Sequence, residues 1–178
     1  SHPKIDFLRL DQYWSTRKKS TLMVFINLTA GEKPMSSPIP TVYCDNIEVP
    51  LKTGPDIRDI TQDLATLVQK SKIENGTLHA TVIGSTGSIT TIEYEPGVVE
   101  DLKRAIRQLA PPEADYAHEL AWHDGNGHSH VQAALLGPCI VLPVRASALA
   151  LGTWQQVVVI NHDNKPRQRP VAVTVLGI

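Results

Sequence analysis

Several features that would point directly to a function are scarce in this sequence. The two cysteines, Cys44 and Cys139, are too far apart to form a C-x-x-C pair, which argues against a redox motif or a disulfide framework. The 17 basic and 18 acidic residues nearly balance, which argues against a general nucleic-acid binder, because such domains are usually strongly basic. No apolar run approaches the roughly 20 residues needed to cross a bilayer. We therefore expect a cytoplasmic protein that binds neither nucleic acids nor membranes.

Length and patterning favour one folded domain preceded by an extension. The chain has 178 residues, and a domain of that size buries enough surface to fold without disulfides. Residues 1–38 show no sustained periodicity of apolar residues. They end in a run rich in proline and serine, which cannot continue a helix. We expect them to form an N-terminal extension, either docked as an arm or poorly ordered, and residues 39–178 to form a single domain.

The patterns within residues 39–178 indicate both strands and helices. Alternating or β-rich segments predict strands over residues 41–51, 77–83, 88–93, 129–136, 139–144, 152–161 and 171–176. Apolar residues at helical spacing predict one helix over about residues 59–71 and a second between Pro96 and Pro111. Most neighbouring elements are joined by short loops. The expected fold is therefore α+β, with two main helices and a largely antiparallel β-sheet or sandwich.

Four of the seven histidines lie within thirteen residues, at positions 118, 123, 128 and 130. Neutral imidazole is the commonest metal ligand, and its ordinary pKa lies near physiological pH. His128 and His130 enter an expected strand two residues apart, so both rings would project from one face and could share a divalent metal with His118. We expect Zn²⁺ or Mg²⁺ at these three histidines. The alternative is a surface loop with solvated histidines.

Other candidate residues follow from their place in the pattern, and each has a plainer alternative. Glu93 ends a strand, where it is a candidate general base or a solvated carboxylate. Arg167 and Arg169 straddle one residue, so both guanidinium groups can face one way and bind phosphate, or lie on an exposed hairpin. Trp154 begins an apolar strand and suits ring stacking or core packing. Residues 84–87 form a hydroxyl-rich turn that could present N–H groups to an anion, or an ordinary hairpin turn.

Two motifs make the chain recognisable: His128-Ser-His-Val-Gln-Ala-Ala-Leu-Leu-Gly-Pro138, followed by Leu149-Ala-Leu-Gly-Thr-Trp-Gln-Gln156. Over about residues 40–178 the sequence resembles the YjbQ family of small proteins. The resemblance implies a compact α+β fold that assembles as a homotrimer, with a polar pocket near subunit boundaries. The polar signature of the family matches here at His118, Ser129, His130, Gly152, Thr153, Trp154 and Gln155.

Members of the family are described as secondary thiamine-phosphate synthases. The resemblance thus implies an enzyme that joins a pyrimidine pyrophosphate to a thiazole phosphate and releases pyrophosphate. In that interpretation the substrate is a small phosphorylated metabolite, and the catalytic residues are Glu93, His118 and His130. The substrate-binding residues would be Ser129, Trp154, Gln155, Arg167 and Arg169.

The sequence departs from the family at residues 84–88. Typical members carry Ser-Pro-His-Thr-Thr after the second core strand, and this chain has Gly84-Ser-Thr-Gly-Ser88 instead. One family histidine is therefore missing. This departure leaves a second interpretation open, in which the same pocket belongs to a non-catalytic trimer that binds a metal or a metabolite.

Overall fold

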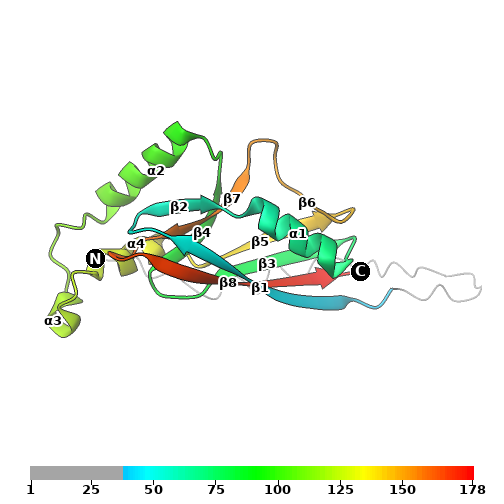
Figure 1. Cartoon of the computed structure of the whole chain (residues 1–178), viewed down its shortest axis with the longest axis horizontal. Helices are drawn as coiled ribbons and strands as arrows, with labels where there is room; N and C mark the ends of the chain where they lie inside the picture. The colour runs from blue at the N-terminus through cyan, green and yellow to red at the C-terminus, as the bar shows by residue number, and fades with distance from the viewer. Residues whose placement is uncertain (1–37) are drawn as a thin grey trace, which may run out of the picture. The chain divides into compact units, whose positions relative to one another are not determined.

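The computed structural model describes residues 38–178, and the expected N-terminal extension lies outside the described residues. Two antiparallel sheets form the framework of this part (Figure 1). One sheet has the strand order β1-β8-β3-β5-β6, and the other has the order β2-β7-β4. The α+β fold with largely antiparallel sheets that the sequence predicts is confirmed.

The five-stranded sheet contains β1 (Thr41–Leu51), β8 (Arg167–Gly177), β3 (Gly76–Val82), β5 (Cys139–Arg145) and β6 (Ala148–Leu149). Its central strands bury every second side chain, as the alternation in the sequence predicts. The buried residues of β3 and β8 are Leu78, Ala80, Val82, Val171, Val173 and Val175. The intervening residues are partly or fully exposed, so among residues 38–178 no element packs over this side of the sheet, which is called the open face below.

The three-stranded sheet contains β2 (Asp56–Asp59), β7 (Gln156–Asn161) and β4 (Gly87–Ile92). The central strand β7 is covered on both faces, because Val157 and Val159 pack in the main core while Val158 and Ile160 pack in a second cluster. A strand covered on both faces appears in the sequence as a continuous apolar run. The strand begins at Gln156 rather than at 152, because the amide of Gln155 closes a turn onto Gly152 O.

The helices are α1 (Thr61–Ser71), α2 (Pro96–Leu109), α3 (Glu119–Trp122) and α4 (Gly127–Leu136). The two helices that the sequence predicts, α1 and α2, are confirmed. Glu95 caps α2, since its carboxylate accepts hydrogen bonds from the amides of Gly97 and Val98. In Figure 1, α2 and α3 lie at the opposite end of the fold from α1. No helix within residues 38–178 is long and apolar enough to cross a membrane.

The prediction of a strand over residues 129–136 is wrong, because these residues belong to α4. The segment alternates apolar residues, but it is also rich in the strong helix formers Gln, Ala and Leu, and Gly137 ends it with a φ of 87°. The local propensity therefore prevails over the period-two pattern. On a helix, residues two apart are rotated by about 200° around the axis, so His128 and His130 point in different directions.

Candidate functional site

A cavity of about 560 Å³ lies between the loop before β4, the α3–α4 region and the start of β8. Small-molecule sites commonly measure about 300–1,000 Å³, so the cavity can hold a metabolite. It is lined by Gly84, Ser85, Thr86, His118, Trp122, Asp124, Asn126, His130, Asp163, Arg167, Gln168 and Arg169. Four separate segments of the chain thus contribute to one pocket.

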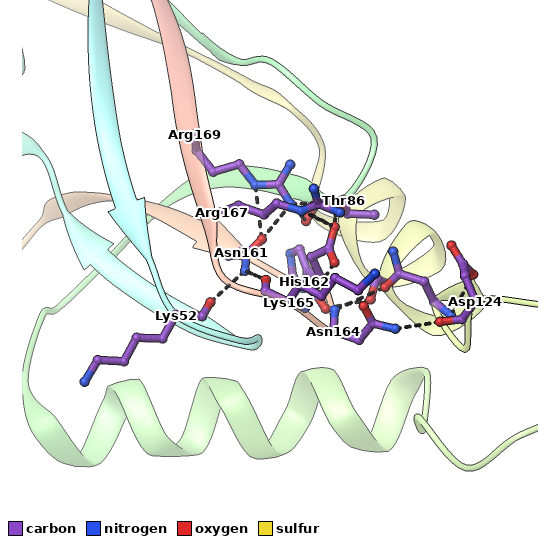
Figure 2. A network of polar contacts seen from close by, with 12 residues as sticks. Lys52, Thr86, Asp124, Asn161, His162, Asn164, Lys165, Arg167 and Arg169 are labelled. Atoms are coloured by element: carbon purple, nitrogen blue, oxygen red, sulfur yellow. Dashed lines mark hydrogen bonds and ion pairs between the residues drawn. The ribbon is translucent and has the colours of Figure 1, made fainter.

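A buried polar network forms the base of the cavity (Figure 2). Arg169 on β8 donates to Asn161 Oδ1 through Nε at 3.1 Å and through Nη2 at 2.6 Å. The same Nη2 also donates to Thr86 O at 3.1 Å. Asp163 accepts from Thr86 Oγ1 at 2.9 Å and from Arg167 Nε at 2.8 Å. The network fixes the 84–86 loop, the end of β7 and the start of β8 to one another.

The charges in this network are paired, with one cation left partly free. Burial raises the pKa of the Asp163 carboxyl, but the hydrogen bonds from Arg167 and Thr86 lower it more, so that the pKa lies below its usual value. Asp163 is therefore ionised at neutral pH. The Arg167 side chain is 47% exposed, and within residues 38–178 its Nη nitrogens have no protein acceptor. Arg167 is thus the more exposed of the two arginines that line this cavity, and it is the one that we expect a ligand to contact.

The 84–87 loop, where the chain departs from the family pattern, packs directly on Arg169. Gly84 has a φ of 128°, and a Cβ at this position would lie 2.7 Å from Arg169 Nη1. The backbone conformation favours glycine here, and a side chain would also displace the end of Arg169. The loop that lacks the family histidine therefore lies against a buried guanidinium group.

His118 and His130 are brought together, as the sequence predicts. Their ring centroids lie 4.6 Å apart, and both rings line the cavity. His118 Nε2 is 3.4 Å from Asp124 Oδ1, although the geometry does not make a hydrogen bond. The other neighbour of His118 is Trp122, whose ring lies nearly parallel to it at 6.4 Å. The arrangement gives two adjacent proton carriers with a carboxylate beside one of them.

His128 is not part of this pair. Its buried ring lies 6.3 Å from the ring of Tyr116, and burial lowers the pKa of this imidazole against the opposing influence of Glu119. No three His, Cys, Asp or Glu side chains in the described part of the chain are grouped to hold a metal ion. The expected metal centre at His118, His128 and His130 therefore does not fit the structure, because α4 is a helix and the two imidazoles of His128 and His130 diverge.

A carboxylate positions the beginning of α4. Glu119 accepts hydrogen bonds from the amides of Gly125 at 2.8 Å and Gly127 at 2.9 Å, and these bonds lower its pKa. Gly127 has no room for a side chain, because a Cβ would lie 2.4 Å from Tyr116 Cβ. These contacts hold the His118 segment against the helix that carries His130.

Directly behind the cavity lies a buried residue that the sequence analysis missed, His162. Its Nε2 is 2.7 Å from Ser88 Oγ, and its Nδ1 is 3.2 Å from Gln132 Oε1. Ser129, expected to bind substrate, is fully buried and donates its hydroxyl to His162 O at 2.6 Å. The one signal for His162 in the sequence is its position in a polar turn immediately after the apolar strand β7.

The remaining predicted site residues lie outside this cavity. Glu93 is exposed beyond the end of β4, about 20 Å along the chain from Gly87 at the usual rise per strand residue. Trp154 is 71% exposed on the turn before β7. Gln155 holds that turn to the sheet by donating to Thr91 Oγ1 at 3.1 Å. The predicted residues thus fall into two separate groups along the described chain.

The fold and the pocket place the chain among small two-sheet α+β proteins with a histidine- and arginine-lined cavity. More specifically, the chain belongs to the UPF0047 family of YjbQ-like proteins, whose family model matches residues 45–178. A UPF0047 protein from Methanothermobacter thermautotrophicus is 33% identical over 73% of this chain and 90% of its own length. Another, from Archaeoglobus fulgidus, is 33% identical over 73% of this chain and its own full length.

Solved structures show the same fold. A YbjQ-like protein of unknown function from Sulfolobus solfataricus superposes with a TM-score of 0.75 at 34% identity, covering 79% of this chain and all of the other. A hypothetical protein from Aeropyrum pernix gives a TM-score of 0.68 at 30% identity, covering 75% of this chain and 99% of its own. These similarities establish the family and the fold of the chain.

Proposed function

We propose that the cavity binds the phosphate-bearing end of a small metabolite and that His118 and His130 exchange protons with it. The observation that carries the proposal is the position of Arg167. Its Nη nitrogens are available in the same cavity as two histidines whose ring centroids lie 4.6 Å apart. A guanidinium group matches two phosphate oxygens at once, and imidazole provides both acid and base near neutral pH. Asp124 Oδ1 lies 3.4 Å from His118 Nε2, which places a carboxylate beside this ring.

The resemblance to the YjbQ family supports a specific reaction for this pocket. In that reaction a pyrimidine pyrophosphate is joined to a thiazole phosphate, and pyrophosphate leaves. Arg167 would hold the leaving pyrophosphate, and His118 or His130 would donate a hydrogen bond or a proton to it as negative charge develops. Arg169 supports this arrangement from below, since it is committed to Asn161 and Thr86.

Replacing Arg167 with glutamine is expected to weaken pyrophosphate binding by about 10- to 100-fold, because a hydrogen bond to a charged group contributes about 1.5–3 kcal/mol. Isothermal titration calorimetry of wild type and Arg167→Gln with pyrophosphate, at one fixed ionic strength, measures this change. Arg107→Gln, which removes an exposed arginine from α2, is the matched control and should bind like wild type. Equal affinity of Arg167→Gln and wild type would contradict the proposal.

Turnover distinguishes the enzyme from the binding protein. Wild type incubated with the pyrimidine pyrophosphate and the thiazole phosphate should form thiamine phosphate, and His118→Gln and His130→Gln should form less of it. Pyrophosphate binding without any product would favour the non-catalytic metabolite-binding trimer instead.

We also propose that the chain assembles as a homotrimer through the open face of the five-stranded sheet. Strand register places Cys44, Thr174, His79 and Val141 in one row across this face, and Val42, Leu176, Thr77 and Pro143 in the next. Neither row contains Asp, Glu, Lys or Arg. An open sheet face with several exposed apolar side chains is typical of a protein–protein interface.

Replacing Val141 with glutamate is expected to dissociate the assembly, because three carboxylates would enter an uncharged interface. Light scattering after gel filtration should give three times the 19.5 kDa chain mass for wild type and a smaller mass for Val141→Glu. Leu109→Glu, which adds a carboxylate on the exposed side of α2, should remain trimeric. A wild-type mass equal to one chain would contradict the proposal.

A further inference from the structure

An aromatic residue that the sequence analysis did not consider stands at the cavity. Trp122, the last residue of α3, lines the cavity and is 72% exposed. Its contact with a ring in the protein is the stacked arrangement with His118, where the planes differ by 20°. Most of the indole surface is thus available to a ligand that enters the cavity.

We infer that Trp122 binds the ring of the ligand by stacking, so that the cavity selects phosphorylated compounds that carry a flat aromatic ring. The inference rests on the proposed phosphate-binding function. It adds to that function a binding position for the ring of the ligand. Trp122 and Arg167 line one cavity of about 560 Å³, so a single small molecule can contact both. Trp154, which the sequence suggested for this role, lies outside the cavity.

Hydrogen bonds fix Trp122 relative to the phosphate-binding side. Glu119, at the other end of the four-residue helix α3, accepts from the amides of Gly125 and Gly127. Asn164 Nδ2 donates to Asp124 O at 2.8 Å, which attaches the same segment to the turn that carries Asp163 (Figure 2). Asp163 in turn holds Arg167. The ring-binding and phosphate-binding groups are therefore joined through a short chain of contacts.

Stacking on an indole favours a ring for two physical reasons. The indole is already partly ordered by His118, so little side-chain entropy is lost when a second ring covers its free surface. Contact between two flat apolar faces removes surface from water and allows an offset arrangement of the two ring systems. A phosphate ester of similar charge that carries a saturated alkyl group gains less binding free energy from the same position.

Two phosphate monoesters of equal charge test the inference, phenyl phosphate and methyl phosphate. Wild type is expected to bind phenyl phosphate about tenfold more tightly than methyl phosphate, which is the scale of stacking on one aromatic side chain. Trp122→Ala should lose most of this preference while keeping its affinity for methyl phosphate. Trp122→Phe, which restores an aromatic face, should recover most of it. Calorimetric titration of each protein with both esters, at constant pH and ionic strength, measures these affinities.

Trp154→Ala is the matched control, because it removes an equally exposed indole from outside the cavity. It should keep the wild-type preference for phenyl phosphate. If Trp122→Ala keeps the preference, or if Trp154→Ala loses it, the inference is wrong even though phosphate binding through Arg167 stands. If pyrophosphate and both monoesters fail to bind wild type, the proposed function fails and the inference with it.

Discussion

Replacement of Arg169 with methionine is expected to lower the free energy of unfolding by about 3–5 kcal/mol, the usual cost of removing one partner from a buried charge network. Methionine fills a similar volume but offers no donor. Asn161 Oδ1 then loses both hydrogen bonds from the guanidinium group, and Thr86 O loses its bond to Nη2. Asp163 keeps Arg167 but loses the positive charge 3.7 Å from its Oδ2.

Urea unfolding at one fixed protein concentration measures this loss as a shift of the transition midpoint. Arg104→Met is the matched control, because Arg104 forms an exposed pair with Asp101 on α2 and such pairs contribute less than about 1 kcal/mol. Arg169→Lys should fall between the two, since it keeps the charge but not the planar set of donors. A loss below about 1 kcal/mol for Arg169→Met would show that the network relaxes around the change.

The second large effect expected is a loss of stability in mild acid that originates at His162. The amide of Gln132 donates through Nε2 to Ala110 O, so its Oε1 faces His162 and requires Nδ1 to carry the proton. Nε2 then accepts from Ser88. The ring is thus held in its neutral form. Burial, assisted by the charges of Arg169 and His128, lowers the pKa of His162 to about 4.

A pKa that is lower in the folded than in the unfolded state gives stability at high pH that is lost as the pH falls. The unfolded chain protonates His162 near its ordinary value of 6.5, whereas the folded chain does so near 4. The stability that this residue provides is therefore complete above about pH 6.5 and declines between pH 6.5 and 4. The decline amounts to about 3 kcal/mol, at about 1.4 kcal/mol per pH unit.

Urea unfolding at several pH values between 7 and 4 should therefore show a steep decline for wild type and a shallower one for His162→Gln, which has no titrating group. The slope of the variant should not vanish, because burial also lowers the pKa of His128. The lowered pKa of Asp163 changes the free energy of unfolding only below its ordinary value of 3.8, which lies outside this pH range. His123→Asn, which replaces an exposed histidine after α3 and outside the open sheet face, should retain the wild-type slope. A wild-type slope in His162→Gln would assign the effect to other groups.

The strand and helix patterns of the sequence predicted most of the framework. Alternation in residues 41–51 and 77–83 produced β1 and β3, and helical spacing near Leu64 and Ile106 produced α1 and α2. The segment 129–136 was predicted wrongly because its apolar residues satisfy both periods over so short a length. Only the packing of Gln132 and Ala133 into the interior, with Leu135 outside, shows the helical period.

The candidate site was predicted in part. The sequence indicated His118, His130, Arg167 and Arg169, and all four line one cavity. It could not indicate Trp122 as a cavity residue or His162 as a buried one, because neither lies in a pattern that distinguishes it from an exposed loop residue. The three-histidine metal centre depended on a strand that does not form.

The sequence by itself determined the local periodicities, the near-neutral charge, the family and the kinds of chemistry that are available. These properties are local or compositional, so they need no knowledge of which segments meet. The tertiary structure decided which imidazoles and guanidinium groups share a cavity, because Thr86 and Arg169 are 83 residues apart in the chain and contact each other only when β4, β7 and β8 come together. It also decided that Arg169 is buried, with Nε and Nη2 bonded to Asn161 and Thr86, while the Arg167 side chain is half-exposed, since burial and pairing are properties of the packed fold.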